Sequence, residues 1–162
     1  LGTGGGICQL SSTLYNSTLF ANLEIVERHN HYYQTSYIEA GRDATVSWGT
    51  LDFQFKNNRE YPIQIIATAG SGTVKVDIMG IKQSDDYNVE IQANILSYID
   101  KDEKMVRNTE LAPGEEDVIQ EGEEGCVSET YKRLLKNGQI VSEELISTDT
   151  YNPLSKITEY NN

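Results

Sequence analysis

A run of three glycines at residues 4–6 leads directly into a cysteine and then into a pattern typical of a helix. Apolar residues after Cys8 recur at spacings of three to four residues or multiples of them, and no proline interrupts the segment. These apolar residues are Leu10, Leu14, Ala21 and Ile25. The sequence therefore predicts a flexible turn and then a helix of about four turns, ending near residues 22–24, with Cys8 in its first turn.

The position of Cys8 at a helix N-terminus favours a reactive thiol, because free N–H groups and the helix dipole stabilise a thiolate. The N–H groups of Ile7 and Cys8 are candidate donors to an oxyanion, and Gly6 lets a substrate approach the backbone closely. Ser11 lies one helical turn later, so its hydroxyl either faces the same site or serves the helix end. The alternative for Cys8 is a buried, inert cysteine.

Two histidines and an Arg–Asp pair are the other candidate site residues. His29 and His31 are the only histidines, and a cysteine nucleophile usually needs one as its base. In a strand they would point to opposite faces, so only one of them should face Cys8. Arg42 is a candidate to bind a substrate carboxylate, and Asp43 is a candidate to orient the histidine. A turn capped by Asp43 is the alternative.

From residue 45 the pattern changes to the alternation typical of strands. Asn137-Gly138 is a strong signal for a hairpin turn. Trp48 and Tyr37 are expected in the core. The sequence predicts an α+β fold that is mostly β, with one N-terminal helix starting near Cys8 and antiparallel strands after it. The expected strands are residues 37–40, 45–48, 51–55, 62–66, 73–79, 89–95, 117–121, 126–135, 139–147 and 151–160.

The net charge of −12 is concentrated in the second half of this 162-residue chain. Residues 1–84 hold six Lys and Arg against seven Asp and Glu, a net charge of −1, whereas residues 85–162 hold seven against eighteen, a net charge of −11. This shift predicts a domain boundary near residues 84–86. It also excludes nucleic acid as a partner, because phosphate binding requires clustered basic residues.

The sequence indicates no metal and no cofactor. Residues 100–103 are acidic but lack the glycine and the distal glutamate of a calcium loop, and no Cys/His spacing matches a zinc site. A disulfide between Cys8 and Cys126 is conceivable but would abolish the nucleophile. No apolar run has the length of a membrane span and no signal peptide is visible, so we expect any membrane anchor to lie in upstream sequence absent from this chain.

Three ordered blocks in the first half resemble the VanW domain family. The match covers roughly residues 1–80, so residues 1–84 resemble the C-terminal part of a VanW domain whose upstream part is missing. The blocks are Gly-Gly-Gly-Ile-Cys-Gln-Leu-Ser-Ser-Thr-Leu-Tyr-Asn at 4–16, then 27–31 with Tyr37 and 41–46, then 51–58 with 61–63.

The VanW resemblance implies a function in the bacterial cell wall. The family takes its name from a vancomycin-resistance cluster, and its members are implicated as cysteine L,D-transpeptidases that cross-link peptidoglycan. Cys8 would then form a thioester with a stem peptide, and the family pattern favours His31 over His29 as the base. The expected partners are peptidoglycan stem peptides or glycan. The expected location is the surface or wall of a bacterium, Gram-positive by the same resemblance.

Residues 85–162 resemble a G5-like module, a β-rich unit found on bacterial surfaces, often beside wall enzymes. The resemblance rests on the Gly-x-x-Gly turn at 122–125, a strand through 130–132, and the hairpin at 137–138. Two other functions stay open: a non-catalytic wall-binding scaffold with a structural Cys8, and a protease or amidase that uses water as the acceptor. A Cys8 sulfur in a cleft near a histidine favours catalysis, whereas a sulfur sealed in apolar packing favours the scaffold.

Overall fold

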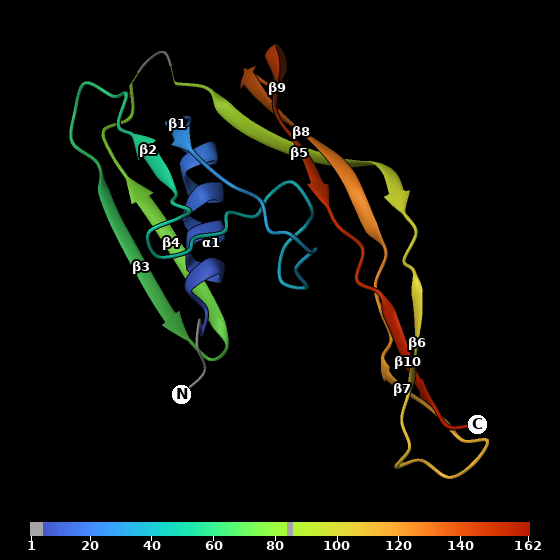
Figure 1. Ribbon diagram of the computed structural model, residues 1–162. Coiled ribbons are helices and arrows are strands. Elements are labelled where there is room, and N and C mark those ends of the chain that lie inside the picture. The colour runs from blue at the N-terminus through green and yellow to red at the C-terminus, as the bar shows by residue number, and fades with distance from the viewer. Residues whose placement is uncertain (1–4, 84–85) are drawn as a thin grey trace.

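The computed structural model describes residues 5–83 and 86–162, which form one helix and ten strands (Figure 1). The fold class predicted from the sequence, mostly β with one helix near Cys8, is confirmed. The first half contains helix α1 (Ile7–Phe20) and strands β1 (Glu24–Glu27), β2 (Gln54–Lys56), β3 (Gln64–Gly70) and β4 (Thr73–Met79). The second half contains β5 (Asn88–Ile99), β6 (Glu103–Arg107), β7 (Glu116–Gln120), β8 (Gly125–Lys136), β9 (Gln139–Tyr151) and β10 (Lys156–Tyr160).

Helix α1 begins at the end of the glycine run, as predicted. Gly6 precedes it with a φ of 87°, a left-handed conformation that glycine adopts without steric cost. The Leu10 N–H donates to the Gly6 carbonyl at 3.0 Å and so closes the first turn. The helix ends at Phe20, slightly earlier than predicted, because Asn22 takes a left-handed φ of 52° and turns the chain into β1.

The strands of the first half form two antiparallel pairs, β1–β2 and β3–β4, and α1 packs against β4 (Figure 1). The strands predicted at 37–40 and 45–48 are wrong. Both stretches belong to an irregular segment between β1 and β2, where the described residues form only an isolated Ser47–Leu51 bridge. The alternation of Val46 and Trp48 does not extend into a strand, because the chain reverses over residues 47–50 around Gly49, whose φ is 77°.

The second half is a narrow arm of two consecutive sheets that leads away from α1 (Figure 1). In the first sheet β8 lies between β5 and β9, with antiparallel pairing throughout. The β8–β9 hairpin turns through Asn137 and Gly138, both with positive φ, as the Asn-Gly pair predicts. In the second sheet β10 lies between β6 and β7, and its pairing with β6 is parallel, which the sequence did not predict.

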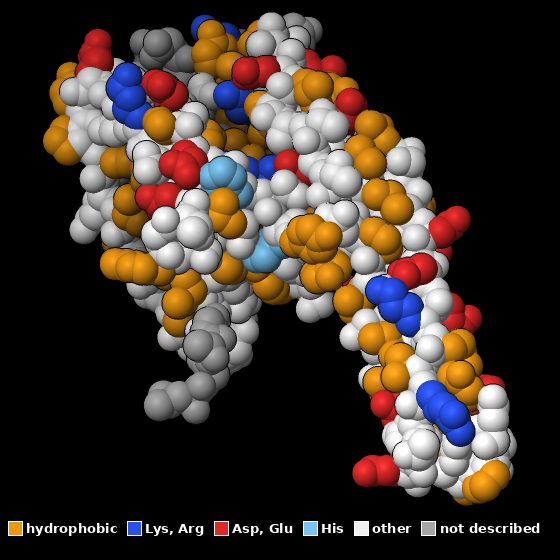
Figure 2. All heavy atoms as spheres, viewed as in Figure 1, with side chains coloured by type: hydrophobic (Ala, Val, Ile, Leu, Met, Phe, Trp, Pro, Cys, Tyr) orange, Lys and Arg blue, Asp and Glu red, His pale blue; other side chains and the backbone are white. Residues whose placement is uncertain are grey.

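The arm exposes many of its apolar side chains. Tyr98 is 63 % exposed, and Ile119 and Ile140 are each 53 % exposed. Figure 2 shows hydrophobic and acidic side chains next to one another along its surface. Two thin sheets placed one after the other leave little room for a core of their own, so packing against the first half contributes to the stability of the arm.

The apolar core centres on the inner face of α1 and takes in side chains from both halves. Its buried members are Tyr15, Leu19 and Ala44, and the partly buried residues around them are Ile25, Phe53, Ile91 of β5 and Ile146 of β9. The sequence led us to expect two separate cores, but the two halves share packing here. The predicted boundary near residues 84–86 falls partly outside the described residues, and the division into 1–84 and 85–162 stays a prediction.

Within residues 5–83 and 86–162, no helix has both the length and the apolar character needed to cross a membrane.

Candidate functional site

Cys8 lies in the first turn of α1 and is partly exposed. Its sulfur is 3.6 Å from the Thr45 hydroxyl and 3.5 Å from the Val46 carbonyl oxygen. The irregular segment before β2 therefore passes directly beside the helix N-terminus. The N–H groups of Ile7 and Cys8 belong to the first turn, where backbone donors have no acceptor within the helix. The predicted setting of a thiol beside first-turn N–H donors stays a prediction that this position supports.

His31 is held by Asp43 through two hydrogen bonds to one carboxylate oxygen. The His31 backbone N–H donates to Asp43 Oδ2 at 2.7 Å, and His31 Nδ1 lies 2.5 Å from the same oxygen. A carboxylate accepts, so Nδ1 carries the proton and Nε2 is the ring nitrogen free to exchange one. The Tyr37 hydroxyl lies 3.2 Å from Nε2. The predicted orientation of a histidine by Asp43 matches this geometry.

The local charges favour an ion pair between Cys8 and His31. Burial raises the pKa of the Cys8 thiol, but hydrogen bonding to Val46 and Thr45 and the neighbouring His31 together bring that pKa below its ordinary value. The hydrogen bond to Asp43 raises the pKa of His31, and this effect outweighs burial, which lowers it. Both shifts favour the thiolate and the imidazolium, which together are the reactive form of a Cys–His pair.

We expect alkylation of Cys8 by iodoacetamide to show this ion pair in its dependence on pH. Only the thiolate reacts, so a lowered pKa puts the midpoint of the rate profile below the free-cysteine value of about 8.5. Replacing His31 by alanine should move the midpoint upward, whereas His29→Ala should leave it in place. The buried Cys126, whose pKa burial raises, should react slowly, and peptide mass analysis separates the two thiols. A wild-type midpoint at or above 8.5 would contradict the prediction.

A buried charge cluster surrounds the far side of Asp43. Arg28 Nη2 donates to Asp43 Oδ1 at 3.0 Å, and Arg28 Nη1 donates to Asp149 Oδ1 at 2.5 Å. The Tyr151 hydroxyl also donates to Asp43 Oδ1. Burial raises the pKa of Asp43, but the hydrogen bonds from His31 and Tyr151 and the charge of Arg28 hold it below its usual range. Sequence reasoning missed these three partners, although Arg28 stands three residues before His31.

Two residues predicted for the site, Ser11 and Arg42, have other surroundings. Ser11 is buried, and its hydroxyl donates to the Ala44 carbonyl oxygen at 2.5 Å, so it joins α1 to the segment that carries Asp43. Arg42 donates to Asn16 at 2.8 Å, about 12 Å further along the helix axis than Cys8. The structure therefore does not bring Arg42 to Cys8, and the guanidinium beside Asp43 is that of Arg28.

The other histidine also differs in its surroundings. His29 is partly exposed, and its Nε2 lies 3.0 Å from Glu27 Oε1. His29 and His31 both lie in irregular structure after β1, which ends at Glu27, so the alternation that a strand would impose does not apply to them. The sequence choice of His31 as the base, with His29 aside, stays a prediction that this geometry supports.

A groove of about 750 Å³ opens beside Cys8. Trp48 on its wall is fully exposed, and Ile7 is 59 % exposed, so the groove presents a large apolar surface to solvent. The expectation that Trp48 and Tyr37 belong to the core is wrong, since Tyr37 is 41 % exposed. The remaining walls are Val46, Leu51, Gly49, two hydroxyl residues (Ser47 and Thr50) and two carboxylates (Glu27 and Asp52).

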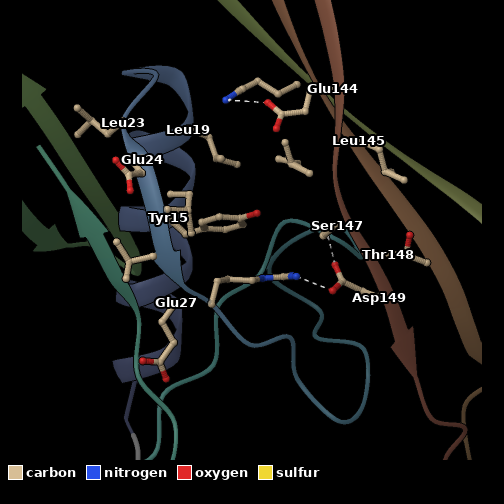
Figure 3. A pocket seen from close by; sticks show the side chains of 15 residues that line it. Tyr15, Leu19, Leu23, Glu24, Glu27, Glu144, Leu145, Ser147, Thr148 and Asp149 are labelled. Carbon is tan, nitrogen blue, oxygen red and sulfur yellow. Dashed lines mark hydrogen bonds and ion pairs between the residues drawn. The ribbon is translucent and has the colours of Figure 1, made fainter. Parts of the chain in front are cut away.

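A second pocket, of about 530 Å³, separates α1 and β1 from β9 (Figure 3). Tyr15 and Leu19 point into it from the helix, and Asp149 points into it from β9, where it accepts hydrogen bonds from Ser147 and Arg28 (Figure 3). The pocket is lined by structural ion pairs rather than by a nucleophile. Among the described residues, no group of three His, Cys, Asp or Glu side chains is placed to hold a metal ion.

Comparisons with known proteins show which domain families this chain resembles. Residues 1–79 match the family described as VanW like protein, and residues 96–161 match the G5 domain. The chain therefore carries a VanW domain region followed by a G5 domain, in the order that the sequence blocks predicted. Together the two domains indicate a cell-wall-associated protein of the cell surface.

The individual relatives each cover one part of the chain. The uncharacterized protein YoaR of Bacillus subtilis (strain 168) is 48 % identical over 77 residues, which is 48 % of this chain and 25 % of YoaR, so the match spans a quarter of that relative. The IgA1 protease G5 domain structure is 29 % identical with a TM-score of 0.33, covering 49 % of this chain and 95 % of that one. The crystal structure of HP0197-G5 is 16 % identical with a TM-score of 0.27, covering 47 % and 99 %.

Proposed function

We propose that the protein is a cysteine L,D-transpeptidase that cross-links peptidoglycan through a thioester on Cys8. The observation that carries the proposal is the placement of the Cys8 thiol at the N-terminus of α1, beside a histidine that a buried aspartate orients. The VanW match and its G5 neighbour support a substrate in the cell wall.

The chemistry follows from the proton positions. The Cys8 thiolate attacks the carbonyl carbon of an L-to-D bond in a donor stem peptide, and backbone N–H groups of Ile7 and Cys8 stabilise the oxyanion. The C–S bond forms, the C–N bond breaks, and the leaving D-alanine takes its proton from His31 Nε2. An acceptor amine then attacks the thioester and gives its proton to Nε2. The new C–N bond releases the Cys8 thiolate for another cycle.

The groove beside Cys8 suits both substrates of this reaction. The exposed rings and alkyl chains of Trp48 and Ile7 offer apolar surface to a stem peptide or a sugar ring. Glu27 and Asp52 add negative charge at the walls, which attracts the ammonium group of an acceptor. A substrate bound there lies directly against the thiol.

The test is incubation of the protein with purified tetrapeptide-containing muropeptides, followed by mass analysis of products and protein. A transpeptidase gives cross-linked dimers, free D-alanine and a tripeptide thioester on Cys8. An amidase or protease gives hydrolysed peptides without dimers. A scaffold gives binding without turnover, and that result would reject catalysis.

Replacing Trp48 by alanine should weaken substrate binding more than chemistry. We expect KM to rise about five- to tenfold, the equivalent of roughly 1–1.4 kcal/mol of lost apolar contact, with kcat nearly unchanged. The matched control is Tyr98→Ala, which removes an exposed aromatic ring from β5, outside the groove. Equal KM values for wild type and Trp48→Ala would remove Trp48 from the binding surface.

A further inference from the structure

The segment that carries His31 and Asp43 has no regular structure, yet it holds the two side chains in one geometry. Residues 28–46 lie between β1 and β2 without a strand of their own. Several of their backbone groups bind instead to the G5 domain. The Asn152 N–H donates to the Tyr32 carbonyl at 2.7 Å, and the Thr130 hydroxyl donates to the Gly41 carbonyl at 3.0 Å. The G5 domain therefore supplies hydrogen-bond partners to this segment.

Tyr151, the last residue of β9, reaches furthest into the segment. Its side chain is 1 % exposed, its hydroxyl donates to Asp43 Oδ1, and the Gly41 N–H donates to the same hydroxyl at 2.7 Å. The Tyr151 hydroxyl therefore donates its one proton to Asp43 and accepts a hydrogen bond from Gly41. The chain of bonds from Gly41 through Tyr151 to Asp43 fixes the side chain and the backbone together.

Asp149, two residues earlier on β9, acts through Arg28. Its Oδ1 accepts from Arg28 Nη1 at 2.5 Å, and its Oδ2 accepts from Ser147 at 3.0 Å (Figure 3). With one end anchored on β9, the guanidinium donates Nη2 to Asp43 Oδ1 at 3.0 Å and Nε to the Asp43 carbonyl at 2.7 Å. The Arg28 and Asp149 side chains are each 7 % exposed, so water competes little for these bonds.

The two oxygens of Asp43 have separate tasks. Oδ1 receives Tyr151 and Arg28, whereas Oδ2 receives both N–H groups of His31. With Oδ1 held, the carboxylate has one rotamer and Oδ2 faces Nδ1. Without the Tyr151 hydroxyl, Arg28 is the remaining side-chain donor to Oδ1. The carboxylate can then rotate, and its hydrogen bonds to His31 are lost.

We propose that Tyr151 and Asp149 of the G5 domain are positioning residues for the Cys8–His31–Asp43 site, so that the G5 domain forms part of the reactive centre as well as lying beside it. This inference rests on the proposed function for its catalytic meaning. The titratable and charged groups that face one another across the two domains here are Cys8, Tyr15, Arg28, His31, Tyr37 and Asp43 from the VanW region and Asp149 and Tyr151 from β9.

The test is Tyr151→Phe, which removes one hydroxyl and keeps the ring. NMR titration of His31, with His29 in the same spectra as an internal reference, should show the pKa of His31 falling toward its ordinary value of about 6.5. The alkylation midpoint of Cys8 should rise in parallel. Turnover of muropeptides should fall by up to about a hundredfold with KM unchanged, because binding does not use this residue.

The matched control is Tyr131→Phe, which also removes a hydroxyl that donates to a carboxylate, Glu129, at 2.7 Å in the same sheet. It should leave the His31 titration and the Cys8 profile as in wild type. Asp149→Asn is the second variant, in case Tyr151→Phe does not fold. It should lower the pKa of His31 in the same direction through a less firmly held Arg28.

A folded Tyr151→Phe or Asp149→Asn protein with a wild-type His31 titration and Cys8 profile would overturn the positioning role. A rise in the pKa of His31 would also overturn it. That result would mean that the Tyr151 hydroxyl only weakens Asp43 as a hydrogen-bond acceptor for His31 and does not position it. Both readouts need no substrate. They therefore separate this inference from the proposed function, which fails on the muropeptide assay alone.

Discussion

Replacing Cys8 by alanine is expected to abolish cross-linking while leaving the fold intact. In the proposed mechanism the acyl group is carried by the Cys8 thiol alone. Without that thiol no thioester forms, and the acceptor amine has no acyl-enzyme to attack. The Cys8 side chain is partly exposed and its neighbours are Thr45, Val46 and His31, so replacing the sulfur by hydrogen should cost little stability. The measurement is the yield of muropeptide dimers, with the thermal transition of each protein as the check on folding.

Cys126→Ala is the control for Cys8→Ala. This second cysteine is fully buried in β8, where a thiol serves packing, so cross-linking should persist. Undiminished cross-linking by Cys8→Ala would end the catalytic proposal and leave the wall-binding scaffold as the function.

Replacing Arg28 by methionine should destabilise the protein by about 3–5 kcal/mol. Methionine keeps much of the buried volume but leaves Asp43 and Asp149 facing each other without the cation between them. Removing one partner of a buried ionic cluster costs this much because the remaining charge stays desolvated. Denaturant titration, monitored by circular dichroism, gives the loss in the free energy of unfolding.

Lys75→Met provides the comparison for an exposed ion pair. Lys75 lies 2.6 Å from Asp77 on β4 with both side chains largely in solvent, so we expect a change of about 0–1 kcal/mol. If Arg28→Met lost only about 0–1 kcal/mol of unfolding free energy, the buried charge cluster would contribute little to stability.

The pH dependence of the loss in unfolding free energy shows whether Arg28→Met destabilises the protein through the lost charge or through altered packing. Because the pKa of Asp43 is lowered in the folded protein, its contribution to stability is present above the unfolded pKa of about 3.9 and is lost as pH falls through the folded value. The arginine supplies part of that contribution. The difference between wild type and Arg28→Met should therefore shrink as the pH is lowered below about 4, whereas a packing defect would persist.

The parts of this fold that sequence reasoning predicted are those set by neighbouring residues. The helix start follows from Gly6 and the spacing after it, and the β8–β9 hairpin follows from Asn137-Gly138, because each depends on local backbone preference. The irregular segment around residues 28–46 was not predictable in this way. Its conformation comes from contacts with β8 and β9 more than eighty residues away in sequence.

The same reason explains which site residues were found and which were missed. Cys8, His31 and Asp43 carry chemistry that a residue type indicates by itself. Arg28 and Arg42 look alike in sequence, and only the tertiary contacts show that Arg28 reaches Asp43 while Arg42 binds Asn16. Tyr151 lies 108 residues from Asp43 along the chain, and no local pattern joins two such positions.

The close contact at Gly41 means that this VanW region fits a G5 domain with a particular residue at the position of Thr130. Its φ of 89° disfavours any side chain, and a Cβ there would collide with the Thr130 hydroxyl of β8. The Gly41 backbone therefore packs directly against the Thr130 side chain of β8, which donates a hydrogen bond to it. A chimera that grafts a foreign G5 domain onto this VanW region would need a small residue in place of Thr130 or a hydroxyl at the same point.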